Sequence, residues 1–320
     1  MIPINSPVEP ITFQAIYQER VWGGRELERH YGRSLPDPKS PIGESWEIVD
    51  RDEAQSIVTS GPLKGQSLHQ LWTEQREEIF GSGYDNHRRF PLLIKILDAR
   101  DDLSIQVHPP AHLAKKLGGE AKTEMWFIAD CEPGATLYVG LKQGVTRDTL
   151  EKAIQDGSVS DCVHTITPKP GDSIFVPSGR LHAIGAGFLI YEIQQSSNTT
   201  FRVFDWNRTG LDGKPRELHV DESLASIDFD DIEPTMDTPD GDTLASCAYF
   251  KTDRIALNNG DSLTNPNPDY FSILSVVNGS LESESGHHYQ KGDFVLLPKN
   301  TTPVTATADT SVLQITLPVC

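Results

Sequence analysis

Cysteine is scarce in this chain of 320 residues, and long apolar runs are absent. The four cysteines, Cys131, Cys162, Cys247 and Cys320, show no paired spacing, so we expect free thiols in a reducing compartment rather than a disulfide framework. No apolar stretch approaches the roughly 20 residues that a helix needs to cross a bilayer, and the N-terminus lacks a signal-peptide pattern. These absences predict a cytoplasmic protein with no membrane as partner.

Basic residues are also in deficit. The chain has 28 Lys and Arg against 46 Asp and Glu, which makes its formal net charge −18 at pH 7. A protein this acidic is repelled by nucleic acid and by anionic membranes, so we expect neither as a partner. An anionic small substrate is still compatible with this charge. Screening acts over about 8 Å at physiological salt, so a local cluster of Lys and Arg sets the potential inside a pocket.

Turn-forming residues, in contrast, are plentiful. The 22 prolines and 25 glycines break the chain into short segments, a pattern typical of many short strands rather than long helices. The length allows one large or two medium domains. We therefore predict a mainly β protein, with a first domain over residues 1–230 and a second β domain over residues 240–320. Helical segments are expected near residues 67–80, 111–118 and 146–156.

Two alternating runs in the middle of the chain present polar residues that bind metals. In the first run, Ser104, Gln106 and His108 alternate with aliphatic residues, so in a strand their side chains share one face. In the second run, Lys122 and Glu124 are two residues apart and share a face in the same way. A Gln, a His and a Glu are thus presented together, which is a ligand set that lacks one more histidine.

That histidine is supplied by residues 171–182, which read GDSIFVPSGRLH. Gly-Asp opens a turn, Ser-Ile-Phe-Val forms a strand, and Pro-Ser-Gly makes a second turn before His182. The spacing G-x5-P-x-G-x2-H is the second half of the cupin signature, which places a metal-binding histidine on a barrel strand. The first half is loosely present, with Gln106-x-His108 in place of His-x-His and a longer gap to Glu124.

These residues form a candidate metal site. Two imidazoles, one carboxylate and one amide oxygen suit a borderline cation such as Zn²⁺, with an open position for water or substrate. The donor atoms alone do not separate Zn²⁺ from Mn²⁺, Fe²⁺ or Co²⁺. The remaining histidines lack a site-forming spacing, and we interpret them as structural or surface groups.

Charged residues in apolar surroundings extend the candidate site. Lys95 lies inside the apolar run FPLLIKIL, and a buried, unpaired ammonium is costly, so we expect it to face a carboxylate, an anion or a wet cavity. Glu192 lies in the alternating run FLIYEIQ, and Arg202 lies in FRVFDWNR.

The C-terminal part contains a relative of the histidine-bearing segment. Residues 291–303, KGDFVLLPKNTTP, repeat the turn, strand and proline of residues 171–182 but lack the histidine. We interpret them as a second, degenerate barrel repeat that binds no metal.

As a set, these segments resemble the type I mannose-6-phosphate isomerases, in particular their short bacterial form. The matching segments are VWGGREL, IGESWEI, LSIQVHP, KTEMW, GDSIFVPSGRLHAIG and FRVFDWNR, which run from about residue 20 to residue 208. The resemblance implies two cupin-like (jelly-roll) barrels with a small helical insertion. It also implies a zinc-dependent isomerase of carbohydrate metabolism. Such an enzyme interconverts mannose 6-phosphate and fructose 6-phosphate through a metal-stabilised cis-enediolate.

The resemblance further implies roles for individual residues. One zinc ion per chain maps onto the four ligands Gln106, His108, Glu124 and His182. Catalytic roles map onto Arg202, Glu192 and Lys95. Substrate binding maps onto Ser104, Lys122 and Arg202. The general base is left open between Glu192 and Lys95, and Arg202 serves either the developing oxyanion or the phosphate.

Two rival functions use the same residues. One is a cupin oxygenase with Fe²⁺, and the other is a non-catalytic sugar-phosphate-binding protein. The cations Lys95, Lys122 and Arg202 favour a small phosphorylated substrate over the needs of an oxygenase, and the complete ligand set favours an enzyme over a binding protein. A monomer and a homodimer are equally compatible with the sequence.

Overall fold

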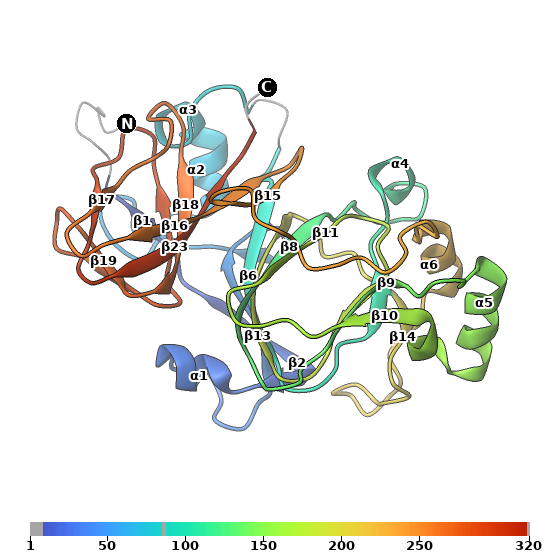
Figure 1. The fold of residues 1–320 in the computed structure, drawn as a ribbon. Helices are drawn as coiled ribbons and strands as arrows, with labels where there is room; N and C mark the ends of the chain where they lie inside the picture. Colours follow the sequence, from blue (N-terminus) through green and yellow to red (C-terminus); the bar gives the residue numbers. More distant parts are fainter. Residues whose placement is uncertain (1–8, 85–87, 319–320) are drawn as a thin grey trace. The chain divides into compact units, whose positions relative to one another are not determined.

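The protein is built mainly from short strands. The computed structural model describes residues 9–84 and 88–318, coloured along the chain in Figure 1. Strands outnumber helices in these residues, so the predicted mainly β class is confirmed. Contacts divide the chain into two units. Unit 1 comprises the described parts of Met1–Ile16, Glu47–Leu93 and Thr238–Cys320, and unit 2 comprises Tyr17–Trp46 and Ile94–Asp237.

Two sheets form most of unit 2. The six-stranded sheet has the order β11 (Ser173–Val176), β8 (Glu124–Cys131), β13 (Phe188–Gln195), β6 (Leu92–Ala99), β2 (Ile16–Gly24) and β3 (Ile42–Ile48). The five-stranded sheet has the order β10 (Val163–Ile166), β9 (Leu137–Leu141), β12 (His182–Ile184), β7 (Ile105–Val107) and β14 (Phe201–Phe204). The described pairings between these strands are antiparallel.

The core of unit 2 joins these sheets. Trp126 and Ile128 of β8 belong to one buried cluster with Leu137 and Val139 of β9. These side chains recur at every second residue, as a strand with one face turned to a core requires. Burying each large side chain contributes about 1.5–3 kcal/mol. The same alternation brings Glu124, two residues before Trp126, to the inner face.

Unit 1 contains a second pair of sheets. The six-stranded sheet has the order β1 (Ile11–Thr12), β21 (Phe294–Leu297), β18 (Ser272–Asn278), β23 (Thr310–Thr316), β16 (Lys251–Leu257) and β15 (Thr243–Ser246). The four-stranded sheet has the order β17 (Ser262–Leu263), β22 (Val304–Ala306), β19 (Ser280–Ser283) and β20 (His288–Gln290). A buried cluster that includes Leu274, Val295, Leu281 and Val304 joins them. The short β4 (Asp50–Arg51) and β5 (Ala54–Gln55) pair separately.

The helices are short. They are α1 (Glu26–Tyr31), α2 (Leu68–Glu74), α3 (Arg76–Ile79), α4 (Ala111–Ala114), α5 (Arg147–Asp156) and α6 (Val220–Ser226), with a 3₁₀ turn at Val159–Cys162. In Figure 1, α5 and α6 lie beside each other in unit 2. Among the residues that the structure describes, no helix is long and apolar enough to cross a membrane.

Several local expectations need adjustment. The helix expected over residues 67–80 is two helices that meet at Gln75, and the segment near 111–118 is helical only over α4. The sequence analysis did not predict α1 or α6, because each is under eight residues and its amphipathic pattern is brief. Cys131, Cys162 and Cys247 are free thiols, and Cys320 lies outside the described residues.

The contact units also differ from the predicted domain boundaries. Residues 47–93, which the sequence analysis assigned to the first domain, group with the C-terminal strands. An aromatic cluster explains this, because Phe80 and Phe90 pack on Phe271 with ring centroids 5.1 and 5.7 Å apart. Contacts between residues almost 200 positions apart leave no local signal in the sequence.

Candidate metal centre and active site

Three side chains of ligand type converge in the interior of unit 2. His108 follows β7, while Glu124 begins β8 and His182 begins β12. Glu124 Oε1 lies 3.5 Å from His182 Nε2, and Glu124 Oε2 lies 3.6 Å from His108 Nε2. One ligand atom from each residue lies within 4.8 Å of the others, and all three residues are buried. These three residues could therefore hold a metal ion.

A backbone carbonyl orients each imidazole. His108 Nδ1 lies 2.8 Å from Thr199 O, and His182 Nδ1 lies 2.9 Å from Arg180 O. Because a carbonyl only accepts, both Nδ1 atoms carry the proton, and each Nε2 presents a lone pair toward Glu124. His108 Nε2 is buried and has no hydrogen-bond partner among the described residues. This is the arrangement of metal-binding histidines, whose second nitrogen is held by the protein.

Burial keeps both imidazoles neutral. It lowers the pKa of His108 well below the ordinary value, and the charge of Lys122 adds to the effect. It also lowers the pKa of His182 to about 3. Since the neutral imidazole is the form that binds a metal, neither histidine has to lose a proton at neutral pH.

Gln106 adjoins the three ligands, as the alternation in its strand predicts. It lies opposite His182 in the β7–β12 register, and its Nε2 is 3.3 Å from His182 Nε2. Its Oε1 accepts a hydrogen bond of 3.3 Å from Ser104 Oγ. The amide is thus placed beside the imidazoles and steadied by a neighbour on its own strand face.

A buried ionic network continues from Glu124. Lys122 Nζ lies 2.6 Å from Glu124 Oε2 and 3.0 Å from Glu192 Oε1. Lys95 Nζ lies 3.7 Å from Glu192 Oε2 and 3.8 Å from Glu44 Oε2. Lys95 therefore faces carboxylates, one of the three surroundings expected for a charge in an apolar strand.

The pKa values of the two carboxylates that contact Lys122 shift in opposite directions. Burial raises the pKa of Glu124, and the nearby Glu192 adds to this while Lys122 opposes it. Burial also disfavours ionised Glu192, but Lys122 and Lys95 outweigh it and hold the pKa of Glu192 below its ordinary value. A divalent cation beside Glu124 would favour its ionised form and oppose this rise.

The sequence analysis missed Glu44, which closes the network. Arg20 Nε donates to Glu44 Oε1 at 3.0 Å, and Trp46 Nε1 donates to Glu44 Oε2 at 2.6 Å. Burial raises the pKa of Glu44, but Lys95 and Arg20 more than offset this and lower it overall. The signal was available, because Glu44 occupies the same face as Ile42 and Trp46 in the run IGESWEI.

A cavity of about 580 Å³ opens onto these groups. It is lined by seven residues that the sequence analysis singled out: Lys95, Ser104, Gln106, Lys122, Glu124, Glu192 and Arg202. His108 and His182 are not among its lining residues, but both contact Glu124. Polar or aromatic lining residues that the sequence analysis did not assign include Arg20, Glu44, Trp126, Asn198, Thr200 and Arg216.

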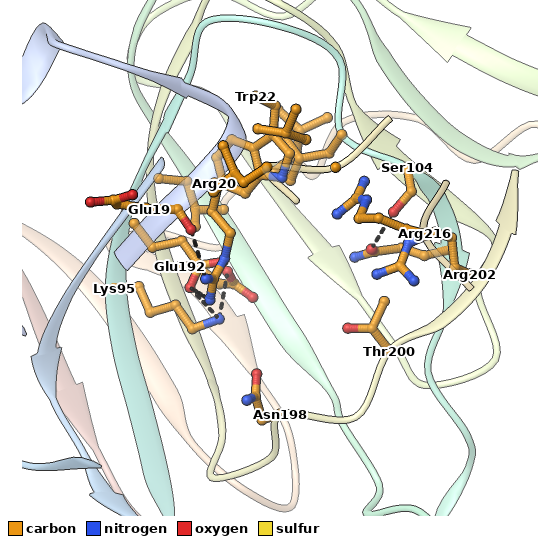
Figure 2. A pocket seen from close by; sticks show the side chains of 18 of the residues that line it. Glu19, Arg20, Trp22, Lys95, Ser104, Glu192, Asn198, Thr200, Arg202 and Arg216 are labelled. Atoms are coloured by element: carbon orange, nitrogen blue, oxygen red, sulfur yellow. Dashed lines mark hydrogen bonds and ion pairs between the residues drawn. The ribbon is translucent and has the colours of Figure 1, made fainter. Parts of the chain in front are cut away.

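Arg202 lies at the other side of this cavity from Lys95. Figure 2 shows Arg202 and Arg216 on one side, and Lys95 with Glu192 on the opposite side. Arg202 of β14 is in register with Gln106 of β7, which places it one strand from the candidate ligands. Its Nη1 donates to Glu217 O at 2.7 Å. The cavity therefore has a candidate metal-binding end and an arginine end.

Comparison with known proteins identifies relatives along nearly the whole chain. The profile of the phosphomannose isomerase type I catalytic domain matches residues 11–139. Mannose-6-phosphate isomerase ManA of Bacillus subtilis is 37% identical over 91% of this chain and 93% of its own length. Mannose-6-phosphate isomerase of Streptococcus mutans is 33% identical over 91% of this chain and 92% of its own.

The fold gives the same relationship. The crystal structure of mannose 6-phosphate isomerase from Bacillus subtilis superposes with a TM-score of 0.86 and 33% identity, covering 97% of this chain and all of that one. Sequence, fold and the buried His–Glu–His group agree, and the chain belongs to the type I phosphomannose isomerase family.

Proposed function

We propose that this chain interconverts mannose 6-phosphate and fructose 6-phosphate, using one Zn²⁺ held by Gln106, His108, Glu124 and His182. The observation that carries the proposal is the buried His–Glu–His group, which contacts a cavity lined with cations. The family and the names of the relatives support the same reaction.

The donor set suits zinc. Two neutral imidazoles with their Nδ1 atoms held by carbonyls, one carboxylate and the side-chain amide of Gln106 are groups that Zn²⁺ binds in proteins. When bound, the metal would act as a Lewis acid on sugar oxygens and lower the energy of an enediolate. The orphaned Nε2 of His108 and the raised pKa of Glu124 both favour a cation at this point.

Isomerisation needs a group that moves a proton between C2 and C1. We assign this role to Glu192, whose carboxylate lines the cavity and lies 3.0 Å from Lys122, which also contacts Glu124. Lys95 lies between Glu192 and Glu44 and is placed to position them. Lys122 joins Glu192 to the metal ligand Glu124, so base and metal are held in one relative geometry.

Arg202 serves the charge that develops during the reaction. Its register with Gln106 places Arg202 one strand from the candidate metal ligands in the wall of the same cavity, and its Nη1 bond to Glu217 O limits the motion of the side chain. A preorganised cation of this kind stabilises an oxyanion more strongly than it stabilises a neutral sugar. Ser104, beside Gln106, offers a hydroxyl to the substrate.

A coupled assay tests the proposal. Purified protein is mixed with mannose 6-phosphate, and the fructose 6-phosphate formed is measured before chelation, after chelation and after zinc is restored. We expect turnover that a chelator abolishes and zinc restores, with about one metal per chain by elemental analysis. Binding of fructose 6-phosphate without turnover in the zinc-loaded protein would instead favour the sugar-phosphate-binding reading. Oxygen uptake with Fe²⁺ would favour an oxygenase.

A further inference from the structure

The two ends of the cavity differ in charge balance. At the metal end, the cations Arg20, Lys95 and Lys122 are matched by the carboxylates Glu44, Glu124 and Glu192, which lie within 4 Å of them. Each charge there already has a partner of the opposite sign. A divalent metal adds positive charge at that end, but the protein side chains alone offer little to a separate anion.

At the arginine end, Arg202 and Arg216 line the cavity, and Arg216 shares the buried carboxylate of Asp205 with Arg208, which is not among the lining residues. Asp205 Oδ2 accepts from Arg216 Nε at 2.7 Å, and Asp205 Oδ1 lies 3.0 Å from Arg208 Nη2. Arg202 has no carboxylate within ion-pair distance in the described part of the chain. Burial and the positive charge of Arg216 lower the pKa of Arg202, although the charges of Asp205 and Glu217 oppose this. Exposed Asp212 also lines the cavity, but solvent screens it.

The backbone holds Arg216 next to Arg202. The segment after β14 turns back in a small hairpin, in which Gly210 N donates to Lys214 O at 2.7 Å. It then returns along β14, where Arg202 Nη1 donates to Glu217 O and His219 N donates to Arg202 O at 2.8 Å. Arg216 is therefore brought back to the cavity wall by contacts on both sides of it.

We propose that Arg216, oriented by Asp205, is the residue that recognises the phosphate of the substrate. This inference rests on the proposed function, because it names the group that selects a phosphorylated sugar. A phosphate dianion suits an end where Arg202 and Arg216 both line the cavity and Asp205 is the buried carboxylate that pairs with Arg216. A guanidinium fork binds phosphate oxygens with two parallel hydrogen bonds. Asp205 occupies one edge of the Arg216 guanidinium, which limits the directions in which the remaining N–H groups can point.

Arg202 and Arg216 have different roles in this proposal. Arg202 lies across the strand pair from Gln106 and so serves the reacting end, whereas Arg216 has no register contact with the metal-ligand strands. Phosphate binding is the same in the ground state and the transition state, so losing it raises KM more than it lowers kcat. Arg216 is thus a binding residue, and Asp205 is a positioning residue that acts through it.

The test uses Arg216→Met in the zinc-loaded full chain. We expect KM for mannose 6-phosphate to rise about 10- to 100-fold, the range for a lost charge-assisted hydrogen bond, while kcat changes less than about threefold. The inhibition constant of inorganic phosphate should rise in parallel. Asp205 keeps Arg208 as a partner in this variant, so no buried carboxylate is left alone. Arg216→Lys should recover part of the loss.

Arg208→Met is the matched control. Arg208 shares Asp205 with Arg216 but does not line the cavity, and it also lies 3.7 Å from exposed Asp101. We expect its KM and its phosphate inhibition to stay within about threefold of the parent. Asp205→Asn should raise KM without an equal fall in kcat, which a merely structural role would not produce.

The outcomes separate the two proposals. No turnover of mannose 6-phosphate by the parent chain would reject the proposed function itself. An active parent, with Arg216→Met unchanged in KM and in phosphate inhibition, would overturn only the phosphate role. A larger KM effect in Arg208→Met than in Arg216→Met would also overturn it, and would assign the phosphate to the other arginine.

Discussion

The segments 171–182 and 292–303 have the same local structure and different chemistry. Each begins with a glycine at positive φ, +94° for Gly171 and +90° for Gly292, and continues into a four-residue strand, β11 or β21. Each then has a proline, followed by a residue of left-handed backbone, Gly179 or Asn300. Beyond that point the first segment reaches a buried histidine and the second does not.

The partner strands extend this comparison. Val176 of β11 pairs with Glu124, and at the matching place Leu297 of β21 pairs with Ser272. Ser272 donates to Asn265 Oδ1 at 2.7 Å and accepts from Gln314 Nε2 at 3.0 Å. A satisfied neutral network thus occupies the place where unit 2 has the candidate metal ligand Glu124.

The two regions also differ in the charged side chains that they bury. In residues 243–316, all of which the structure describes, the buried polar side chains are hydroxyls and amides, with no charged group. Unit 2 instead buries Glu124, Glu192, Lys95 and Lys122 together. Burying charges is costly and is sustained by mutual pairing or by a ligand. The turn, strand and proline pattern therefore packs a neutral core in residues 243–316, whereas in unit 2 it lies beside the buried charged groups.

The largest effect should come from the one position that separates the segments. His182→Ala removes an imidazole whose Nε2 faces Glu124, and the remaining ligands hold metal poorly. We expect most of the metal to be lost and turnover to fall to background. Pro303→Ala, at the matching place in the second segment, should change neither. Stoichiometric metal in His182→Ala by elemental analysis would count decisively against the site.

Arg202→Ala should give the next largest effect. We expect kcat to fall by about two orders of magnitude or more, because a fixed guanidinium near the reacting end is worth several kcal/mol mainly in the transition state. Saturation kinetics with metal content confirmed gives kcat and KM separately. An increase in KM at normal kcat would instead mean that Arg202 binds the substrate in the ground state, as Arg216 is proposed to do. The two arginines would then have the same role.

Asp98 should make the stability of unit 2 depend on pH. Burial raises the pKa of its carboxyl to about 6, although Glu26 N donates to it at 2.6 Å. Since the folded state then holds the proton more tightly than the unfolded state, stability falls as pH rises from about 4 to about 6, by about 3 kcal/mol.

Asp98→Asn tests this contribution. Chemical denaturation of the variant and the parent between pH 4.5 and 7.5 should show their difference shifting in favour of the variant as pH rises. A difference that does not change with pH would mean that the carboxyl titrates at its ordinary value. Gln314→Glu offers the complementary change in unit 1, where a new buried carboxyl should introduce a pH dependence of the same sign.

The smallest effects are expected in the second segment. Lys299→Ala and Asn300→Ala should leave turnover nearly unchanged, because this repeat has no histidine. Asn300 adopts φ of +52°, a conformation that costs alanine about 1 kcal/mol more. Asn300→Ala should therefore lower the free energy of unfolding while kcat is retained. A hundredfold loss of kcat in either variant would contradict the structural role assigned to the repeat.

Local pattern carried much of the prediction for the metal ligands. The alternation of Ser104, Gln106 and His108 places their side chains on one face whatever surrounds the strand. The spacing of glycine and proline before His182 likewise defines a turn, a strand and a second turn. The structure brings these residues together around Glu124 and places Ser104 against Gln106.

The remaining features of the site and of the fold depend on contacts between segments that are distant in the sequence. Glu44 joins Lys95 because β3 and β6 belong to one sheet, and Arg216 reaches the cavity because a hairpin returns along β14. Residues 47–93 group with the C-terminal strands through aromatic packing on Phe271.

The sequence by itself determined which side chains share a strand face, because the period of two is a property of the extended backbone. It also determined that Lys95 needs a partner, because an ammonium in an apolar strand is costly. Only the tertiary structure decided which carboxylates pair with it and which arginine faces the cavity. Ion pairs depend on register and on chain reversals between distant segments, and their energies fall off over a few ångströms that no local pattern encodes.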